Sequence, residues 1–227
     1  MIDLRPVPLA REAPDAAGPA IELATELAAF SRALYLRGWM PGTSGNLSVR
    51  LPGSEPLALI TASGRDKGEL TAEDTVLVDA RSGAPARPTV LRASAETSIH
   101  AAVYRSTDAG AVIHVHPPYA TAVACRAGGG EGLRLEGFEL LKGLGLAEAS
   151  GTELPVFANW PDVPRIADEI AAYLAARADA PPGLLIADHG ITTWGADLAE
   201  ARNRLECLEA ICHLLLLGVE PTGRTRR

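Results

Sequence analysis

Val112-Ile113-His114-Val115-His116-Pro117-Pro118 is an apolar run that reaches two histidines and stops at paired prolines. The run predicts a strand over residues 111–116. Side chains two residues apart in a strand point to the same face, so His114 and His116 would project together and converge on one ion. Two neutral imidazoles suit zinc better than magnesium or calcium, which prefer oxygen ligands. The alternative is that both histidines donate to backbone carbonyls at the end of a strand.

The bulk composition excludes several classes of protein. A chain of 227 residues, 47% hydrophobic and 22% charged, is typical of a single globular domain. A net charge of −7 does not indicate a protein that binds nucleic acid, because such proteins usually carry an excess of basic residues. Three scattered cysteines do not predict a disulfide framework, which favours a reducing, cytoplasmic location. No signal core follows the start of the chain, and the longest uncharged apolar run is far below the roughly 20 residues that span a bilayer.

Hydrophobic periodicity predicts helices and strands that intermix without a regular βαβ rhythm. This favours an α/β fold in which helices cover both faces of a mixed or antiparallel sheet. We expect one domain over residues 20–218, a flexible segment over 1–19, and a loose tail over 219–227. The glycine-rich segment 128–132 is expected to be a loop that could move. The helices are expected at 21–37, 94–104, 119–126, 164–178 and 197–217, and the strands at 47–50, 57–61, 75–78, 111–116, 154–157, 183–187 and 191–194.

The last of these helices begins with a capping signal. Asp197 precedes Glu200 by three residues, which fits a capping box with an aspartate cap. Near its end the helix is apolar on more than one face, which favours burial in the core, with or without a subunit interface. His213 lies in this apolar turn and is interpreted as a packed histidine rather than a ligand.

A third histidine, His189, lies in a tight turn between two predicted apolar strands. With His114 and His116 it would form a three-histidine site that keeps a fourth position open. Open sites of this kind are catalytic, whereas structural zinc sites are closed by four protein ligands.

Two loops that combine glycine with hydroxyl side chains could bind an anion. Ser44, Gly45 and Asn46 lie in one loop, and Ser63 and Gly64 lie in the other. Such loops offer backbone N–H groups that form concave phosphate nests, to which a lysine nearby could add charge. Lys67 follows the second loop.

Two carboxylates are candidates for proton transfer. Glu96 lies early in the helix predicted over 94–104, and Glu139 lies in the segment Gly137-Phe-Glu-Leu-Leu-Lys-Gly143. Periodicity alone favours a solvated or ion-paired surface acid at each position.

Several of these segments resemble the class II aldolase/adducin-like family, and the resemblance covers roughly residues 20–218. The motifs that carry it are Pro41-Gly-Thr-Ser-Gly-Asn-Leu-Ser48, Thr61-Ala-Ser-Gly-Arg-Asp-Lys-Gly68, Ser94-Ala-Glu96, His114-Val-His-Pro117 and His189-Gly190. The resemblance implies a three-layer α/β/α domain around a central, largely antiparallel sheet. It also implies a homotetramer with active sites at subunit interfaces and one zinc ion in each subunit.

Three further segments resemble the sugar-phosphate dehydratases of that family. They are Glu139-Leu-Leu-Lys142-Gly143, Pro155-Val-Phe-Ala-Asn159 and His189-Gly-Ile-Thr-Thr-Trp194-Gly195. The activity implied is the loss of water from a ketose phosphate through a zinc-stabilised enediolate.

The resemblance also assigns roles residue by residue. His114, His116 and His189 match the zinc ligands, and Glu139 matches the acid/base of the dehydratases. Ser63, Gly64, Ser94 and the Gly45-Asn46 turn match the phosphate site. Glu96 matches the acid/base of the aldolases, and its role as acid/base, fourth ligand or spectator stays open. Ala95 stands where aldolases often have a second serine, so one phosphate contact is not carried over.

Two other functions remain open at this point. A sugar-phosphate aldolase or 4-epimerase of the same family commonly recruits a tyrosine from a neighbouring subunit, and the tail after Leu217 contains none. A non-catalytic, adducin-like binding module would tend to lose the metal histidines, and all three are present.

Overall fold

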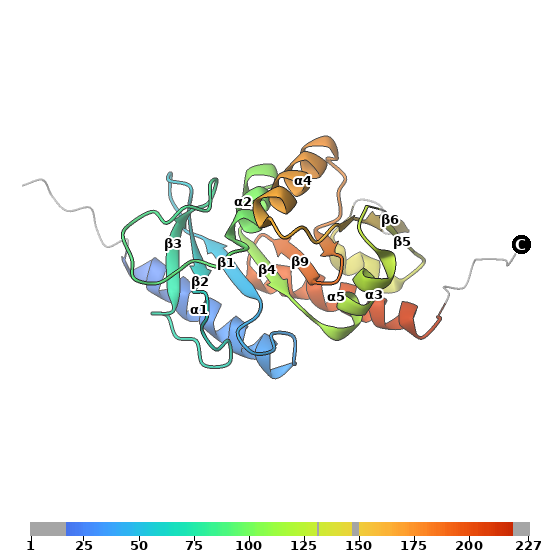
Figure 1. The fold of residues 1–227 in the computed structure, drawn as a ribbon, viewed down its shortest axis with the longest axis horizontal. Coiled ribbons are helices and arrows are strands. Elements are labelled where there is room, and N and C mark those ends of the chain that lie inside the picture. Colours follow the sequence, from blue (N-terminus) through green and yellow to red (C-terminus); the bar gives the residue numbers. More distant parts are fainter. Residues whose placement is uncertain (1–16, 131, 147–149, 220–227) are drawn as a thin grey trace, which may run out of the picture.

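A seven-stranded sheet forms the centre of the fold in the computed structural model, which describes residues 17–130, 132–146 and 150–219 (Figure 1). The strand order is β3-β2-β1-β4-β9-β8-β7, and every neighbouring pair is antiparallel except the parallel pair β7 and β8. The expected largely antiparallel sheet is therefore confirmed. Its strands are β1 (Asn46–Arg50), β2 (Leu57–Thr61), β3 (Thr75–Asp79), β4 (Ala111–Val115), β7 (Val156–Phe157), β8 (Gly183–Ile186) and β9 (Gly190–Gly195).

Helices cover both faces of this sheet and bury a separate apolar core on each. One core contains residues of α1, α3 and α5, and the other contains residues of α2 and α4, which lie side by side in Figure 1. The expected three-layer α/β/α arrangement is confirmed. The helices are α1 (Ala17–Leu36), α2 (Thr97–Ser106), α3 (Pro118–Ala127), α4 (Val163–Ala176) and α5 (Leu198–Leu216). In the described part of the chain, no helix combines the length and apolar character needed to cross a membrane.

Strand alternation assigns each side chain of β1 to one of the two helical layers. Leu47 and Val49 join the core beneath α1 and α5, so Asn46 and Ser48 face the layer of α2 and α4. The register places Asn46 of β1 opposite His114 of β4, and His114 opposite Thr192 of β9. A polar row thus crosses the middle of the sheet on the side of α2.

A small hairpin outside the central sheet was not predicted. Strands β5 (Leu133–Glu136) and β6 (Gly151–Leu154) form it, and the 3-10 helix η1 (Glu139–Leu144) lies between them in sequence. The single strand predicted over 154–157 is wrong. Pro155, which lacks an N–H, separates β6 from β7, and its carbonyl accepts a hydrogen bond from Leu185 of β8.

Two helix starts differ from the predicted ones by more than one residue. Helix α1 begins four residues earlier than predicted, at Ala17, and Pro19 lies in its first turn. Proline is tolerated there because the N–H groups of the first turn have no partner within the helix. Helix α2 begins at Thr97 with Glu96 at the N-cap position, because Thr97 N–H and its hydroxyl both bond Ser94 C=O in a preceding turn. Most of the predicted 1–19 segment, the tail beyond Val219 and Glu131 of the glycine-rich loop lie outside the described residues.

The predicted cap of α5 gives a direct test of this helix. Asp197 accepts a hydrogen bond from Glu200 N–H at 2.8 Å, and the Glu200 carboxylate reaches back to Ala196 N–H at 2.6 Å. We expect Asp197→Ala to lower the free energy of unfolding by about 1 kcal/mol, measured by urea denaturation. Asp197→Asn is the matched control because it keeps an acceptor oxygen. Equal stability of the alanine variant and the wild type would mean that the cap contributes nothing.

Candidate metal centre

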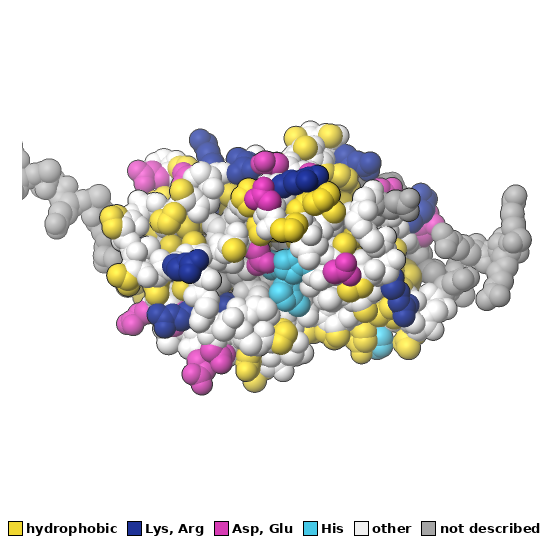
Figure 2. All heavy atoms as spheres, in the orientation of Figure 1, with side chains coloured by type: hydrophobic (Ala, Val, Ile, Leu, Met, Phe, Trp, Pro, Cys, Tyr) yellow, Lys and Arg dark blue, Asp and Glu magenta, His cyan; other side chains and the backbone are white. Residues whose placement is uncertain are grey.

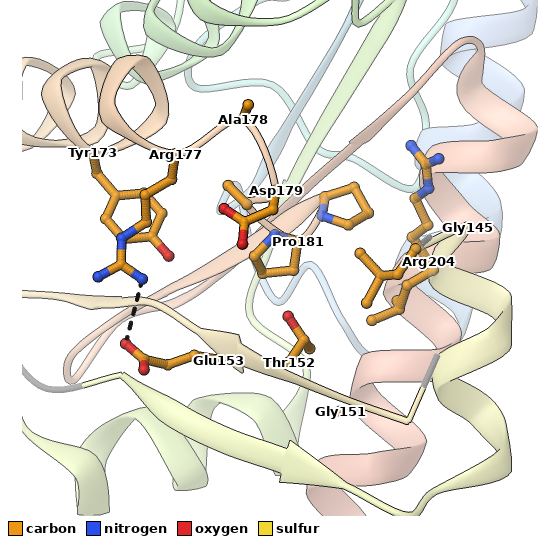
Figure 3. A pocket seen from close by; sticks show the side chains of 14 residues that line it. Gly145, Gly151, Thr152, Glu153, Tyr173, Arg177, Ala178, Asp179, Pro181 and Arg204 are labelled. Atoms are coloured by element: carbon orange, nitrogen blue, oxygen red, sulfur yellow. Dashed lines mark ion pairs between the residues drawn. The ribbon is translucent and has the colours of Figure 1, made fainter. Parts of the chain in front are cut away.

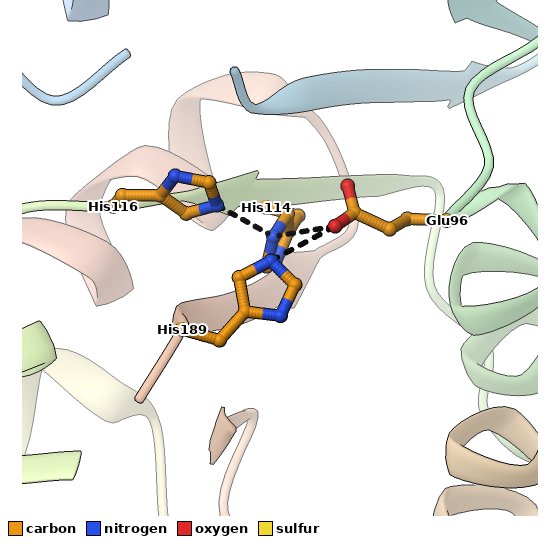
Figure 4. A group of neighbouring side chains, drawn as sticks. All are labelled: Glu96, His114, His116 and His189. Atoms are coloured by element: carbon orange, nitrogen blue, oxygen red, sulfur yellow. Dashed lines mark hydrogen bonds and ion pairs between the residues drawn. The ribbon is translucent and has the colours of Figure 1, made fainter. Parts of the chain in front are cut away.

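Four side chains from distant parts of the sequence converge at one end of β4 (Figure 4). Their potential ligand atoms all lie within 4.8 Å of one another. His114 is the fourth residue of β4, His116 follows the strand, and His189 lies between β8 and β9. Glu96 reaches the group from the N-terminus of α2. Figure 2 shows histidine side chains at the surface near the middle of one face, with an acidic side chain beside them.

Backbone contacts fix the two histidines that lie outside strands. His116 donates its N–H to the carbonyl of Trp39 at 2.9 Å. His189 is placed by a tight turn in which Asp188 adopts a φ of +55°, a left-handed conformation that aspartate tolerates better than most residues. Gly190 is required here because a Cβ atom would lie 2.5 Å from Val115 O and 2.6 Å from the His116 ring. The sequence Asp188-His189-Gly190 therefore aims His189 at the end of β4.

Three of the distances between the potential ligand atoms are close to those found around a four-coordinate zinc ion. His114 Nε2 lies 3.1 Å from His116 Nε2 and 3.5 Å from Glu96 Oε1, and His189 Nε2 lies 2.9 Å from that same oxygen. Ligands around zinc at its usual bond lengths are about 3.4 Å apart. His114 Nδ1 lies 3.0 Å from the Thr192 hydroxyl, and donation to that oxygen leaves the Nε2 lone pair for a metal.

Burial favours the neutral form of the His114 and His116 imidazoles, which is the form that binds a cation. It lowers the pKa of His114 to about 3 and lowers the pKa of His116 as well. Burial by itself raises the pKa of Glu96, but the facing His114 and the hydrogen bonds from His189 and Asn46 outweigh it and lower the pKa below its usual range. Neutral imidazoles beside an ionised carboxylate are ready-made ligands for a divalent metal.

The three segments proposed to hold phosphate meet beside this cluster. Asn46 Nδ2 donates to Ser94 Oγ at 3.0 Å and to Glu96 Oε2 at 2.5 Å, and Ser63 N–H donates to Arg92 C=O at 2.8 Å. Gly45 and Gly64 both adopt positive φ values, which gives each loop its turn. Ser44 uses its hydroxyl locally, donating to Pro41 C=O at 2.7 Å. The loops thus lie close to the candidate metal centre, as an extended substrate would require.

Lys67 is placed differently from a surface lysine that reaches for an anion. Its side chain is 1% exposed, and its ammonium donates to the carbonyls of Thr43 at 2.8 Å and Arg65 at 2.9 Å. Burial lowers the pKa of Lys67. The residue therefore joins the loop before Ser44 to the loop after Gly64.

Glu139 lies outside the cluster within one chain. It begins η1, its side chain is 82% exposed, and its carboxylate accepts a hydrogen bond from Lys142 Nζ at 2.7 Å. His213 is also outside the cluster. Its ring stacks on Tyr119 with centroids 3.8 Å apart, in agreement with the interpretation of a packed histidine.

A separate cavity lies away from the histidines (Figure 3). It has a volume of about 490 Å³, and an ion pair of 3.9 Å between Arg177 and Glu153 lies at its edge. None of the four cluster residues lines it, so it is not part of the candidate metal centre.

Comparison with known proteins identifies the class to which this fold belongs. Residues 25–216 match the family described as Class II Aldolase and Adducin N-terminal domain. The chain belongs to this family. Among solved structures, a putative aldolase/epimerase/decarboxylase from Escherichia coli superposes with a TM-score of 0.74 at 26% identity, over 92% of this chain and 93% of the other.

More similar relatives are found among named enzymes. The chain is 42% identical to the methylthioribulose-1-phosphate dehydratase of Sorangium cellulosum, over 86% of this chain and 92% of that protein. It is 53% identical to a probable bifunctional methylthioribose-1-phosphate isomerase/methylthioribulose-1-phosphate dehydratase of Nocardia farcinica, over 87% of this chain. The match spans 36% of the length of the Nocardia protein.

His100, a buried residue next to the centre, gives a prediction about pH. Burial lowers the pKa of His100 to about 4, so on acidification the unfolded chain takes up this proton before the folded chain does. Stability is therefore lost as the pH falls from about 6.5 towards 4. Glutamine cannot titrate, so the His100→Gln variant should not lose this stability. We expect the free energy of unfolding of the variant, relative to that of the wild type, to rise by about 2 kcal/mol when the pH is lowered from about 7.5 to about 5. Urea unfolding of both proteins measures this, and parallel pH profiles would contradict it.

Proposed function

We propose that this chain is a zinc-dependent hydro-lyase that converts 5-methylthioribulose 1-phosphate to 5-methylthio-2,3-dioxopentyl phosphate and water. The observation that carries the proposal is the 42% identity to a named methylthioribulose-1-phosphate dehydratase over 92% of that protein. The convergence of His114, His116 and His189 supports it independently, since three histidine ligands make a catalytic metal centre if a substrate oxygen can replace Glu96 at the fourth position.

Zinc is the metal that we propose, with one ion in each subunit. Three imidazole nitrogens and one carboxylate oxygen within 4.8 Å of one another favour zinc over magnesium or calcium. A bound zinc ion would supply Lewis acidity to the substrate oxygens next to the proton that leaves. Glu96 Oε1 lies 3.5 Å from His114 Nε2 and 2.9 Å from His189 Nε2, so it would be the fourth ligand of the bound ion. Glu96 would then have one of two roles. It would be a metal ligand that the substrate displaces, or it would be displaced and also transfer a proton.

The phosphate of the substrate is proposed to bind at the loops beside the centre. Ser63, Gly64, Ser94 and the Gly45-Asn46 turn would provide N–H and hydroxyl donors. Lys67 has two of its three donors on backbone carbonyls, which supports a role in joining the two loops. Lys67 would then assist phosphate binding through its positive charge and by holding the two loops in shape. Anchoring the phosphate holds the reacting carbons in place at the metal.

Glu139 is proposed as the acid/base of the reaction. It would remove the proton from C3 of the substrate and deliver a proton to the C4 hydroxyl, which leaves as water, and the enol that remains tautomerises to the diketone. Its 82% exposure and its absence from the cluster of its own chain support a site completed by a neighbouring copy. This agrees with the proposed homotetramer, in which η1 of one subunit would reach the metal centre of the next.

A sugar-phosphate aldolase or 4-epimerase is the second candidate function. These enzymes commonly recruit a tyrosine from a neighbouring subunit, and Tyr119 on α3 is 37% exposed. Its ring is already stacked on His213, and Tyr104 is buried, so neither supports this alternative. A non-catalytic module is the third candidate, and the intact histidine cluster argues against it.

The proposed reaction belongs to methionine salvage, and we propose a cytoplasmic location. All three cysteines are free, which supports a reducing compartment.

The first test is a product assay with the metal-loaded protein. We expect mass spectrometry to detect the loss of one water from intact 5-methylthioribulose 1-phosphate, and a chelator to abolish this loss. Cleavage of the substrate into two fragments would identify an aldolase instead. An unchanged substrate in the presence of bound zinc would refute the proposed substrate.

The second test removes the proposed acid/base. We expect Glu139→Gln to lower turnover by at least about 100-fold with an unchanged zinc content, because general acid–base catalysis contributes on that order. Glu153→Gln, another exposed acid of the same hairpin region, is the matched control and should stay active. His116→Ala should instead lower zinc content and turnover together. Near-normal turnover of the Glu139→Gln protein would remove Glu139 from this role.

A further inference from the structure

A chain of buried polar side chains runs from the interior of the protein to Glu96. The Tyr104 hydroxyl lies 2.7 Å from Ser48 Oγ, which lies 2.6 Å from His100 Nδ1. His100 Nε2 lies 2.6 Å from Asn46 Oδ1, and Asn46 Nδ2 donates to Glu96 Oε2 at 2.5 Å. The four residues behind Glu96 are each at most 4% exposed.

The spacing of these residues follows from the two elements that carry them. Asn46 and Ser48 are two apart on β1 and point to the same face of the sheet. Glu96, His100 and Tyr104 are four apart, so they form one stripe along α2. The stripe and the strand face one another, and the side chains alternate between them along the chain of contacts.

The proton positions along this chain are determined from one end to the other. The Glu96 carboxylate can only accept, so the NH₂ group of Asn46 must face it. Asn46 Oδ1 is then an acceptor, and His100 must carry its proton on Nε2. A neutral His100 has a bare Nδ1, which accepts the Ser48 hydroxyl proton, and Ser48 in turn accepts from Tyr104. Every donor therefore points towards Glu96.

We propose that His100, Ser48 and Tyr104 are positioning residues that fix the amide of Asn46 and, through it, hold Glu96 with one oxygen turned towards the three histidines. Figure 4 shows this arrangement: one oxygen of Glu96 has contacts with His114 and His189, while the other points away from them. That second oxygen is the one held by Asn46. A flipped Asn46 amide would place its own oxygen against the carboxylate, which would then turn away from the cluster.

The energetic reason is that a carboxylate on a flexible side chain loses affinity for a cation when it must be ordered on binding. Hydrogen-bonded groups behind a metal ligand typically contribute 10-fold to 100-fold in metal affinity. This inference rests on the metal centre of the proposed function, but it concerns binding of the ion and does not depend on which substrate is used.

The test measures zinc affinity by competition with a chromophoric chelator, with no substrate present. We expect His100→Leu to weaken zinc binding about 10-fold or more, because Asn46 Oδ1 loses its donor. His100→Gln, which can donate to Asn46 and accept from Ser48, should restore most of the affinity. Val103→Ala is the control for general destabilisation, because Val103 is fully buried on the same helix and outside the chain of contacts.

A double-mutant cycle shows whether His100 acts through Glu96. If it does, His100→Leu should lower zinc affinity much less in a Glu96→Ala background than in the wild type. Equal losses in the two backgrounds, or an equal loss in Val103→Ala and His100→Leu, would overturn the proposal. If the zinc affinities change as expected but the dehydratase assay shows no product, only the proposed substrate is refuted.

The tautomer of His100 provides a readout that is independent of metal. Long-range ¹H–¹⁵N correlation spectra of the wild type at neutral pH should give His100 as the Nε2–H tautomer. The Nδ1–H tautomer would overturn the proposal, since the Asn46 amide would then face the other way.

Discussion

The register of β4 between its two neighbours is the constraint on which the candidate metal centre depends. His114 lies opposite Asn46 on one side and Thr192 on the other. Both of these partners also contact functional groups, since Asn46 bonds Glu96 and Thr192 bonds the second nitrogen of His114. A shift of one residue would turn His114 to the opposite face of the sheet, into the core beneath α1 and α5. The backbone pairing of three strands therefore decides the position, the tautomer and the carboxylate neighbour of the most buried ligand.

Much of this centre could be predicted from the sequence because its signals are local. His114 and His116 are two apart at the end of an apolar run, and His189 lies beside a glycine in a turn. Strand periodicity carries that information directly, and the layers and the largely antiparallel sheet agree with the expectation. Glu96 was a candidate for proton transfer, but its position among the histidines depends on how α2 packs on β1, which no local pattern reports.

Other features could not be predicted for the same reason. Lys67 looks in sequence like a free cation beside a glycine turn, and only the tertiary packing of two loops makes it a buried donor to backbone carbonyls. The strands of the β5–β6 hairpin are separated in sequence by η1. The short turn sequence from which a hairpin is usually predicted is therefore missing. The spacing of Glu96, His100 and Tyr104 was visible along a helix, but its significance required knowing that Asn46 and Ser48 lie opposite.

The sequence distances across β4 have a consequence for how the protein folds. Asn46 and Thr192 lie far from His114 along the chain, yet both must pair with its strand before the ligand is oriented. Contacts of such long range close late and slowly, because the entropy of ordering the intervening chain must be overcome first. A partly folded chain would thus hold the histidines as separate, weak ligands. Binding of one ion by all of these side chains would require the native fold. It would therefore also shift the folding equilibrium towards the folded state.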